Sequence, residues 1–448
     1  MLKKVLIANR GEIAVRVIRA CRELGIHTVA VYSTADKNAL HAKIADEAVC
    51  IGPAASKDSY LNMRAIISAC EVTGAEAIHP GFGFLSENPV FAKTCEKCGI
   101  TFIGPRAESI SMLGDKAQAK ETMKEAGVPV IQGSDGAVFN IHAAHTLAND
   151  LGYPVMVKAS AGGGGRGIRI VRSDDELESQ ITAAKQEALA CFGNDDIYIE
   201  KFIENPKHIE IQIIADNYGN VISLGERDCS MQRRNQKVLE ESPSPASFMN
   251  DELRRKMGEA ACKAAKVCGY RNAGTVEFLV DKNGNFYFME MNTRIQVEHP
   301  ITEMVTGIDL VKQQLLIASG EKLKYKQEDI KMGCHAIECR INAEDPDHNF
   351  RPSPGVIKSL FLPGGMGVRI DSAAYQGYEI PPYYDSMIGK LITFAPTREE
   401  AIAKMRWALA EFIVDGISTN VDFQLKLIRT PEFLEGNYDN NFLNRTKL

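Results

Sequence analysis

The chain has 448 residues, of which 45% are hydrophobic and 25% charged, with a formal net charge of −6 and 11 cysteines. This length allows two or three domains, and the composition is typical of a globular protein in water. The mild negative charge argues against a nucleic-acid or membrane surface, and no apolar run is long enough to cross a bilayer. Scattered cysteines in an odd number favour free thiols in a reducing cytoplasm.

Residues 1–114 alternate short apolar strands with helical segments. Val5–Ala8 and Thr28–Tyr32 have the composition of buried strands, and the apolar spacing over Glu12–Leu24 predicts a helix between them. The alternation predicts a doubly wound parallel sheet. The glycine- and aromatic-rich loop His79–Asn88 follows a strand of that sheet, at the edge where such sheets bind ligands. A purely structural turn is the alternative.

A glycine run marks the second part of the chain, which begins near residue 115. A helix is expected over 116–126, and a strand over Val155–Lys158 is followed by Gly162–Gly167 and a further strand. Consecutive glycines let backbone amides turn toward an anion, and Lys158 adds a positive charge. The segment predicts a phosphate-binding flap. It is not a Walker loop, and a flexible linker is the alternative.

A hairpin then pairs two glutamates. Strands are expected over 273–280 and 286–289, and Asn283-Gly284 between them is a strong signal for a two-residue turn. That register places Glu277 opposite Glu290, where like charges are tolerable if a divalent cation such as Mg²⁺ or Mn²⁺ lies between them. A bulged turn would shift the register by one residue. Two unrelated surface glutamates are the alternative.

The segment 290–299 is predicted to continue as one strand, with alternate side chains on opposite faces. One face then carries a carboxylate, an amide and a guanidinium in a row, namely Glu290, Asn292, Arg294, Gln296 and Glu298. Such a face suits a metal ion and a small oxyanion, although a solvated strand face has a similar pattern. The run Arg227–Lys237, rich in cations, precedes this hairpin and favours an anion pocket.

From about Cys334 the chain is predicted to be β-rich with many turns, and to close with a helix over 398–412. At this point the motifs resemble those of the biotin carboxylase family, within the ATP-grasp superfamily, over essentially the whole chain. The resemblance rests on Ile7–Ala14, His79–Asn88, Gly162–Gly167, Glu290–Pro300, Cys339–Glu344 and Tyr384–Lys390.

The resemblance implies a mixed α/β and α+β fold in three domains. These are a doubly wound N-terminal domain (1–114), an ATP-grasp domain (115–333) with a mobile glycine-rich lid at about 131–203, and a β-rich C-terminal domain (334–448). It also implies a ligase that carboxylates biotin with bicarbonate and ATP through carboxyphosphate, the first half-reaction of a biotin-dependent carboxylase.

The family roles transfer to this sequence residue by residue. The implied ATP-binding residues are Lys116, Lys158, Gly163, Gly164, Gly165, Glu200, Lys201, Phe202, Ile203, His208, Gln232, Asn235 and Leu279. The implied metal ligands are Glu277, Glu290 and Asn292, and the implied bicarbonate cradle is Lys237, Arg294, Gln296 and the backbone of Val297. Glu298 matches the general base, with Arg294, Arg340 and Lys237 as further catalytic residues. Phe82, Arg340 and Val297 match the biotin-binding residues.

Two positions depart from the family pattern. Phe82 stands where the family has Tyr, which removes a hydroxyl contact, and Asn235 stands where it has His, which removes a charge. Neither change falls within the segment 290–298.

The sequence contains no Ala-Met-Lys-Met biotin-attachment motif. We therefore expect biotin on a separate carrier protein and a separate carboxyltransferase. By resemblance the acceptor is acetyl-CoA, for fatty acid synthesis, and the chain is a cytoplasmic homodimer; propionyl-CoA and pyruvate remain open as acceptors. One rival is an ATP-grasp ligase that joins a carboxylate to an amine, which would not need Arg294, Gln296 and Glu298 in this array. The other is a non-catalytic nucleotide-sensing subunit.

Overall fold

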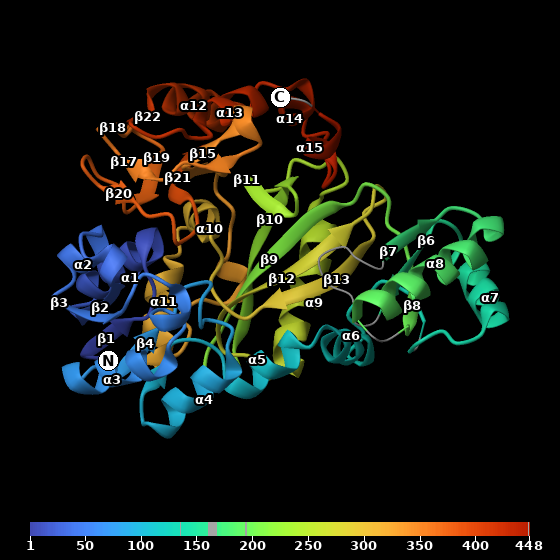
Figure 1. The fold of residues 1–448 in the computed structure, drawn as a ribbon, viewed down its shortest axis with the longest axis horizontal. Coiled ribbons are helices and arrows are strands. Elements are labelled where there is room, and N and C mark those ends of the chain that lie inside the picture. The colour runs from blue at the N-terminus through green and yellow to red at the C-terminus, as the bar shows by residue number, and fades with distance from the viewer. Residues whose placement is uncertain (135, 160–167, 193–194, 447) are drawn as a thin grey trace. The chain divides into compact units, whose positions relative to one another are not determined.

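The computed structural model describes residues 1–134, 136–159, 168–192, 195–446 and 448 (Figure 1). Contacts divide the chain into two compact units. Unit 1 comprises Met1–Val128, Lys207–Phe278 and Glu290–Leu448, and unit 2 comprises Pro129–Pro206 and Leu279–Met289. Among the helices of the described residues, none has both the length and the apolar character needed to cross a membrane.

Unit 1 opens with a five-stranded sheet in the order β3-β2-β1-β4-β5, in which all neighbouring strands are parallel. Its strands are β1 (Lys4–Ile7), β2 (His27–Ser33), β3 (Glu47–Gly52), β4 (Ala77–His79) and β5 (Thr101–Phe102). The helices among them are α1 (Gly11–Glu23), α2 (Leu40–Ile44), α3 (Met63–Thr73), α4 (Pro89–Lys97) and α5 (Ala107–Gly114). Val5 and Ile7 pack in one core cluster with α1, whereas Leu6 packs in another with α3 and α4. The predicted doubly wound sheet is confirmed.

A second sheet has eight strands, in the order β13-β12-β9-β10-β11-β14-β21-β19. Its strands are β9 (Lys207–Ala215), β10 (Val221–Arg233), β11 (Gln236–Ser242), β12 (Asn272–Val280), β13 (Phe286–Asn292), β14 (His335–Asn342), β19 (Val368–Ser372) and β21 (Met387–Ala395). Helices α6 (Lys116–Glu125), α9 (Asp251–Val267), α10 (His299–Thr306) and α11 (Leu310–Ala318) also belong to unit 1. Because β11 pairs with β14, one sheet continues across the sequence boundary predicted at residue 334.

The C-terminal part adds short paired strands and four helices. The strand pairs are β15 (Glu344–Asp345) with β16 (Arg351–Pro352), β17 (Gly355–Val356) with β20 (Glu379–Ile380), and β18 (Ser359–Phe361) with β22 (Ile413–Asp415). Helix α12 (Arg398–Glu411) matches the predicted helix, but α13 (Val421–Leu427), α14 (Pro431–Glu435) and α15 (Phe442–Arg445) follow it. The prediction that the chain closes with α12 is therefore wrong. These short helices depend on packing of Phe423, Phe433 and Phe442 into the core, which local periodicity does not reveal.

The described residues of unit 2 form a three-stranded antiparallel sheet and two helices, to which the segment Leu279–Met289 is added. The strands β6 (Val155–Ala159), β7 (Ile168–Val171) and β8 (Ile197–Lys201) lie in the order β7-β6-β8, and the helices are α7 (Ile141–Leu151) and α8 (Asp174–Phe192). Both helices pack on the sheet face that carries Val155 and Val157 (Figure 1). The predicted glycine flap between β6 and β7 lies outside the described residues.

Candidate active site

The Lys237 ammonium connects three carboxylates of unit 1. Its Nζ donates to Glu210 Oε2 at 2.7 Å, to Glu277 Oε1 at 2.9 Å and to Glu298 Oε1 at 2.8 Å. Lys237 lies on β11, Glu210 on β9 and Glu277 on β12, and Glu298 is the residue that precedes α10. All three carboxylates are buried. The structure thus brings one predicted bicarbonate ligand, one predicted metal ligand and the predicted base into direct contact.

Arg227, which the sequence analysis placed in a cation-rich run without a role of its own, bonds Glu210 of this cluster. Its guanidinium is fully buried and donates to Glu210 Oε1 at 2.5 Å, Gln212 Oε1 at 2.7 Å, Thr302 Oγ1 at 2.9 Å and Thr275 Oγ1 at 3.1 Å. A buried guanidinium with this many acceptors is well satisfied, and it balances the charge of Glu210. Arg227 therefore fixes the carboxylate that in turn positions Lys237.

These cations control the ionisation of the buried carboxylates. Burial alone would raise the pKa of Glu298, but Lys237, Arg340 and Arg227 outweigh it and hold that pKa well below its ordinary value. Burial would likewise raise the pKa of Glu277, but Lys237 and His208 outweigh it and hold that pKa well below its ordinary value. Glu298 is therefore fully ionised and, in this arrangement, a weak proton acceptor.

The prediction of one strand over 290–299 is wrong. Strand β13 ends at Asn292, the chain then bends, and α10 begins at His299. Ile295 is completely buried, and Pro300 occupies the first turn of α10, where its missing amide costs nothing. Strand alternation therefore cannot place the side chains beyond Asn292.

Hydrogen bonds, rather than strand alternation, bring the side chains of Asn292, Arg294 and Gln296 together. Arg294 Nη1 donates to Gln296 Oε1 at 2.7 Å and its Nη2 donates to Asn292 Oδ1 at 3.1 Å. Gln296 Nε2 donates to Glu277 Oε1 at 3.1 Å. Glu87, in the loop after β4, accepts from the Thr293 amide at 3.0 Å and from Arg294 Nε at 2.8 Å. Glu87 thus positions a predicted bicarbonate ligand, a role that the sequence did not suggest.

The prediction of a two-residue turn at Asn283-Gly284 is also wrong. The Asp281 amide donates to the Asn285 carbonyl at 2.9 Å and the Gly284 amide donates to the Asp281 carbonyl at 3.0 Å, so the loop has three residues. Gly284 adopts a left-handed φ of 82°, as in a bulged turn. The register argument that placed Glu277 directly opposite Glu290 therefore fails, because it assumed the shorter turn.

The predicted metal ligands nevertheless offer suitable donors. Asn292 Nδ2 donates to Glu277 Oε1 at 2.9 Å, which places these two side chains on one face. Glu290 is partly exposed and forms an ion pair with Lys116 at 2.9 Å. Two carboxylates and an amide oxygen are the hard ligands that Mg²⁺ prefers, so the residues present fit that ion.

Two other groups of potential metal ligands lie in the same region. They are His208 with Glu210 and Glu277, and Glu210 with Cys229 and Glu298. Lys237 already bonds two carboxylates in each group, and Arg227 bonds the Glu210 carboxylate that the two groups share.

Arg340, on β14, connects the predicted base Glu298 to a second buried glutamate, Glu240. Its Nη2 donates to Glu298 Oε2 at 3.0 Å, and its Nε donates to Glu240 Oε1 at 2.7 Å. Glu240 lies on β11 directly opposite Glu338 on β14, and both carboxyls are completely buried. Burial raises the pKa of Glu240 to about 7, although Arg340 opposes it, and burial raises the pKa of Glu338 well above its ordinary value.

The other predicted biotin contacts are held by their backbones. The Val297 carbonyl accepts from Lys390 Nζ at 2.8 Å, and Lys390 is itself completely buried and 3.1 Å from Glu12 Oε1. The Phe82 carbonyl accepts from Asn9 Nδ2 at 2.8 Å, while its ring is half-buried.

The predicted nucleotide residues fall into both units. In unit 1, the Gln232 amide lies 2.7 Å from His208 Nδ1, His208 Nε2 lies 3.0 Å from Glu277 Oε2, and Asn235 adopts a left-handed φ of 64° in the turn between β10 and β11. In unit 2, Lys158 forms an ion pair with Glu200.

The remaining nucleotide residues of unit 2 lie at the end of β8 and near it. Lys201 Nζ donates to the Gly152 carbonyl at 2.7 Å, and the Phe202 amide donates to the Pro154 carbonyl at 3.2 Å. Ile203 follows and is half-buried, and Leu279 belongs to the hairpin segment of the same unit. Gly163, Gly164 and Gly165 lie outside the described residues.

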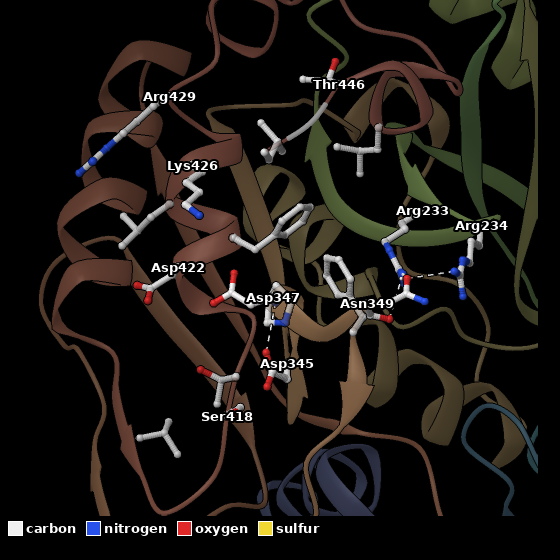
Figure 2. Close-up of a pocket in the computed structure, with 18 of the residues that line it drawn as sticks. Arg233, Arg234, Asp345, Asp347, Asn349, Ser418, Asp422, Lys426, Arg429 and Thr446 are labelled. Carbon is white, nitrogen blue, oxygen red and sulfur yellow. Dashed lines mark hydrogen bonds between the residues drawn. The ribbon is translucent and has the colours of Figure 1, made fainter.

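A cavity of about 860 Å³ lies elsewhere in unit 1, between α13, the turn that contains Asn349 and the end of β10. Figure 2 shows Arg233 and Arg234 side by side, both hydrogen-bonded to Asn349, with Lys426 on the opposite wall. As far as the described residues go, its lining includes none of the predicted site residues. The size of this cavity therefore does not identify the active site.

Three family models match the chain. They are described as "Biotin carboxylase, N-terminal domain" over residues 1–110, "Carbamoyl-phosphate synthase L chain, ATP binding domain" over 115–326, and "Biotin carboxylase C-terminal domain" over 338–445. Biotin carboxylase 1 of Bacillus subtilis is 62% identical over 444 residues, which cover 99% of this chain and 98% of the relative. The chloroplastic biotin carboxylase of Arabidopsis thaliana is 56% identical over 440 residues, covering 98% and 82%.

Solved structures agree with these sequences. A biotin carboxylase complex from Campylobacter jejuni has a TM-score of 0.90 and 53% identity, covering 100% of this chain and 99% of that one. The biotin carboxylase domain dimer of 2-oxoglutarate carboxylase from Hydrogenobacter thermophilus, in complex with MgADP, ADP and bicarbonate, has a TM-score of 0.89 and 54% identity, covering 99% and 97%. The biotin carboxylase subunit of a pyruvate carboxylase has a TM-score of 0.91 and 55% identity, covering 99% and 98%.

Proposed function

We propose that the residues around Lys237 carry out the reaction of this chain. The chain belongs to the biotin carboxylase family and is a ligase that carboxylates biotin at the expense of ATP. The observation that carries this assignment is that Lys237 and Arg340 both contact Glu298. A proton acceptor and two anion-binding cations therefore share one buried cluster.

Lys237, Arg294, Gln296 and the Val297 backbone form the proposed bicarbonate cradle. The contacts of Arg294 with Gln296, and of Gln296 with Glu277, support a single connected array. Two cations and an amide donor suit a small planar anion, which is otherwise strongly hydrated. In the cradle the anion would lie close to the proposed base.

Glu298 is the proposed general base that removes the bicarbonate proton, so that a bicarbonate oxygen attacks the γ-phosphorus of ATP and ADP leaves. Its pKa is held far too low for this role while Lys237 and Arg340 both contact it. Substrate binding must therefore weaken one of these contacts. Transfer of the Arg340 Nη2 hydrogen bond from Glu298 to the ureido oxygen of biotin would release the base at the moment when both substrates are present.

The carboxyphosphate formed in this step would decompose to CO₂ and phosphate. That phosphate is basic enough to take the ureido N–H proton, and the nitrogen then attacks CO₂ to form carboxybiotin. Arg340 would stabilise the negative charge that develops on the ureido oxygen. Phe82 and the Val297 backbone would complete the biotin site.

Glu277, Glu290 and Asn292 are the proposed ligands of Mg²⁺ or Mn²⁺. When bound, the ion neutralises charge that builds up on the phosphates during transfer. The MgADP in the Hydrogenobacter thermophilus structure supports Mg²⁺ as the choice. Lys116, which contacts Glu290 in this structure, would then turn to the nucleotide phosphates.

For the nucleotide we propose the residues of the sequence analysis, with Lys158 and the 162–167 flap over the phosphates and Glu200–Ile203 at the adenine. The proposed domains are 1–114, 115–333 and 334–448, with a lid over about 131–203. The separate compact unit Pro129–Pro206, joined by Leu279–Met289, supports a lid of this extent.

We further propose that biotin arrives on a separate carrier protein and that a separate carboxyltransferase passes the carboxyl group to acetyl-CoA, for fatty acid synthesis in the cytoplasm. The bacterial and plastid relatives support this setting, while the pyruvate and 2-oxoglutarate carboxylases among the solved structures represent other acceptors. The dimer in one of those structures supports a homodimer.

The variant Arg340→Ala tests the site assignment. It should lower biotin-dependent ATP cleavage with free biotin by about a hundredfold or more, as expected for loss of a charge-stabilising donor, and spare the slower bicarbonate-dependent cleavage without biotin. Equal losses in both assays would remove the proposed role of Arg340. ATP cleavage that free biotin stimulates without bicarbonate would contradict the proposed order of steps.

A further inference from the structure

Glu240 contacts Arg340 but has no assigned role in the proposed reaction. Glu240 accepts from Arg340 Nε at 2.7 Å, and Arg340 Nη2 lies 2.5 Å from the same oxygen. Arg340 Nη2 also donates to Glu298. The fork made by Nε and Nη2 on one carboxylate oxygen fixes the plane of the guanidinium, since neither atom can leave without losing a charge-assisted hydrogen bond.

Glu240 has an unusual neighbour. Glu338 lies directly opposite it across β11 and β14, where facing side chains approach closely. Both carboxyls are completely buried, and within the described part of the chain neither oxygen of Glu338, nor the second oxygen of Glu240, has a hydrogen-bond partner. Two ionised carboxylates would repel each other here, so at least one of them must hold a proton.

Other charged groups around the pair decide which carboxyl is ionised. Glu240 has the Arg340 guanidinium in direct contact, with Glu298 and Lys237 beyond it. Glu338 faces Lys390, whose ammonium is already committed to the Val297 carbonyl and to Glu12. The direct cation partner favours the charge on Glu240, and Glu338 is the better place for the proton.

We propose that Glu240 is a positioning residue for the biotin half of the reaction: it holds Arg340 in the orientation that receives the ureido oxygen, while Glu338 stays neutral across the sheet. The inference rests on the proposed role of Arg340. A neutral Glu338 keeps a second negative charge away from Arg340. The guanidinium therefore retains positive charge for the developing oxyanion of biotin.

The test compares Glu240→Gln with Glu226→Gln. Glu226 is a matched control because it is an equally buried glutamate bonded to Arg254 Nε at 2.8 Å, on β10 and outside the proposed site. Each variant is assayed with free biotin for kcat and KM of biotin-dependent ATP cleavage, and for bicarbonate-dependent cleavage without biotin. Loss of one hydrogen bond to a charged group should lower kcat/KM for biotin by about 10- to 100-fold in Glu240→Gln.

Four comparisons of rates test the positioning role of Glu240. Cleavage without biotin should stay within about threefold of the parent, because only the biotin step needs Arg340 in this orientation. Glu240→Asp should recover part of the loss by restoring the carboxylate, and Glu338→Gln should cost much less than Glu240→Gln, since an amide resembles a protonated carboxyl. Equal losses with and without biotin, or an effect no larger than in Glu226→Gln, would overturn the proposal, as would equal losses in Glu338→Gln and Glu240→Gln.

Arg340→Ala separates this inference from the proposed function. If Arg340→Ala shows no biotin-specific loss, the assigned role of Arg340 fails. If Arg340→Ala shows the loss and Glu240→Gln does not, only the positioning role of Glu240 fails. Should Glu240→Gln not fold, Glu240→Asp in the same two assays gives the answer, because displacement of the carboxylate by one methylene should still lower only the biotin-dependent rate.

Discussion

Removal of the Lys237 charge should destabilise the protein most at neutral pH. In Lys237→Met the side chain stays unbranched, but Glu210, Glu277 and Glu298 lose the ammonium that in the parent lies 2.7–2.9 Å from each of them. Breaking a buried ion pair by removal of one partner costs about 3–5 kcal/mol, because an uncompensated charge stays buried. We expect a loss of at least that size in the free energy of unfolding.

The pH dependence of this loss follows from linkage. In the parent the pKa values of Glu277 and Glu298 are held well below the ordinary value, so both residues stabilise the folded state above that value and lose this contribution as the pH falls. Without Lys237, burial is opposed mainly by His208 at Glu277 and by Arg340 and Arg227 at Glu298, so both pKa values rise from those of the parent. The variant then gains less stability than the parent as the pH rises. The gap between the two proteins must therefore grow from acid toward neutral pH.

Scanning calorimetry of the ligand-free proteins at about pH 5 and about pH 7.5 measures this gap as a difference in the midpoint of the unit 1 transition. Lys256→Met is the control, since Lys256 is an exposed lysine paired with Glu252 at 2.8 Å, and such surface pairs contribute about 0–1 kcal/mol. A gap for Lys237→Met that is the same at both pH values, or no larger than for the control, would refute the electrostatic account of the cluster.

Three further changes test two residues of the site and Glu241, a buried carboxylate on β11. Glu298→Gln should lower biotin-dependent ATP cleavage by at least about a hundredfold while nucleotide still binds, and near-normal turnover would remove the assignment of the base. Glu290→Gln should raise the Mg²⁺ concentration for half-maximal cleavage by about tenfold or more, as read from a metal titration, because it replaces a carboxylate ligand by an amide. Burial would raise the pKa of Glu241, but His335 and Arg398 outweigh it and lower the pKa from 4.5 to about 2. This shift stabilises the folded state by about 3 kcal/mol above pH 4.5, and the contribution disappears as the pH falls toward 2. Glu241→Gln should therefore lower the thermal midpoint at neutral pH and converge with the parent in acid.

The fold could be predicted from the sequence where burial has a local signature. Val5–Ala8 and the helix over Glu12–Leu24 are examples, since a fully buried strand and an amphipathic helix each leave a periodic apolar pattern. Strand β13 shows where this stops. Polar and apolar residues continue to alternate after Asn292, but burial of Ile295 and the start of α10 at His299 turn the chain out of the sheet. Alternation alone cannot distinguish an extended turn from a strand.

The candidate site was predicted only in part. Lys237, Glu277 and Glu298 stand in recognisable motifs, and the structure brings them together. Arg227 and Glu240 lie at strand positions where a polar residue would normally face water. Only the pairing of β11 with β14, and of β9 with β10, shows that these charges are inside the protein.

The contacts around the cluster explain how its acids can lie together. Arg227 bonds Glu210 and Arg340 bonds Glu298, so these two cations add to the charge of Lys237 among the three carboxyls. The same balance makes Glu298 too weak a base at rest, so catalysis in the proposed scheme requires a substrate that draws a cation away from it. The Arg340 contact with Glu298 is the better candidate to give way, because Lys237 bonds three carboxylates and Arg340 bonds two. Coupling of the base to the arrival of biotin thus follows from the arrangement of charges.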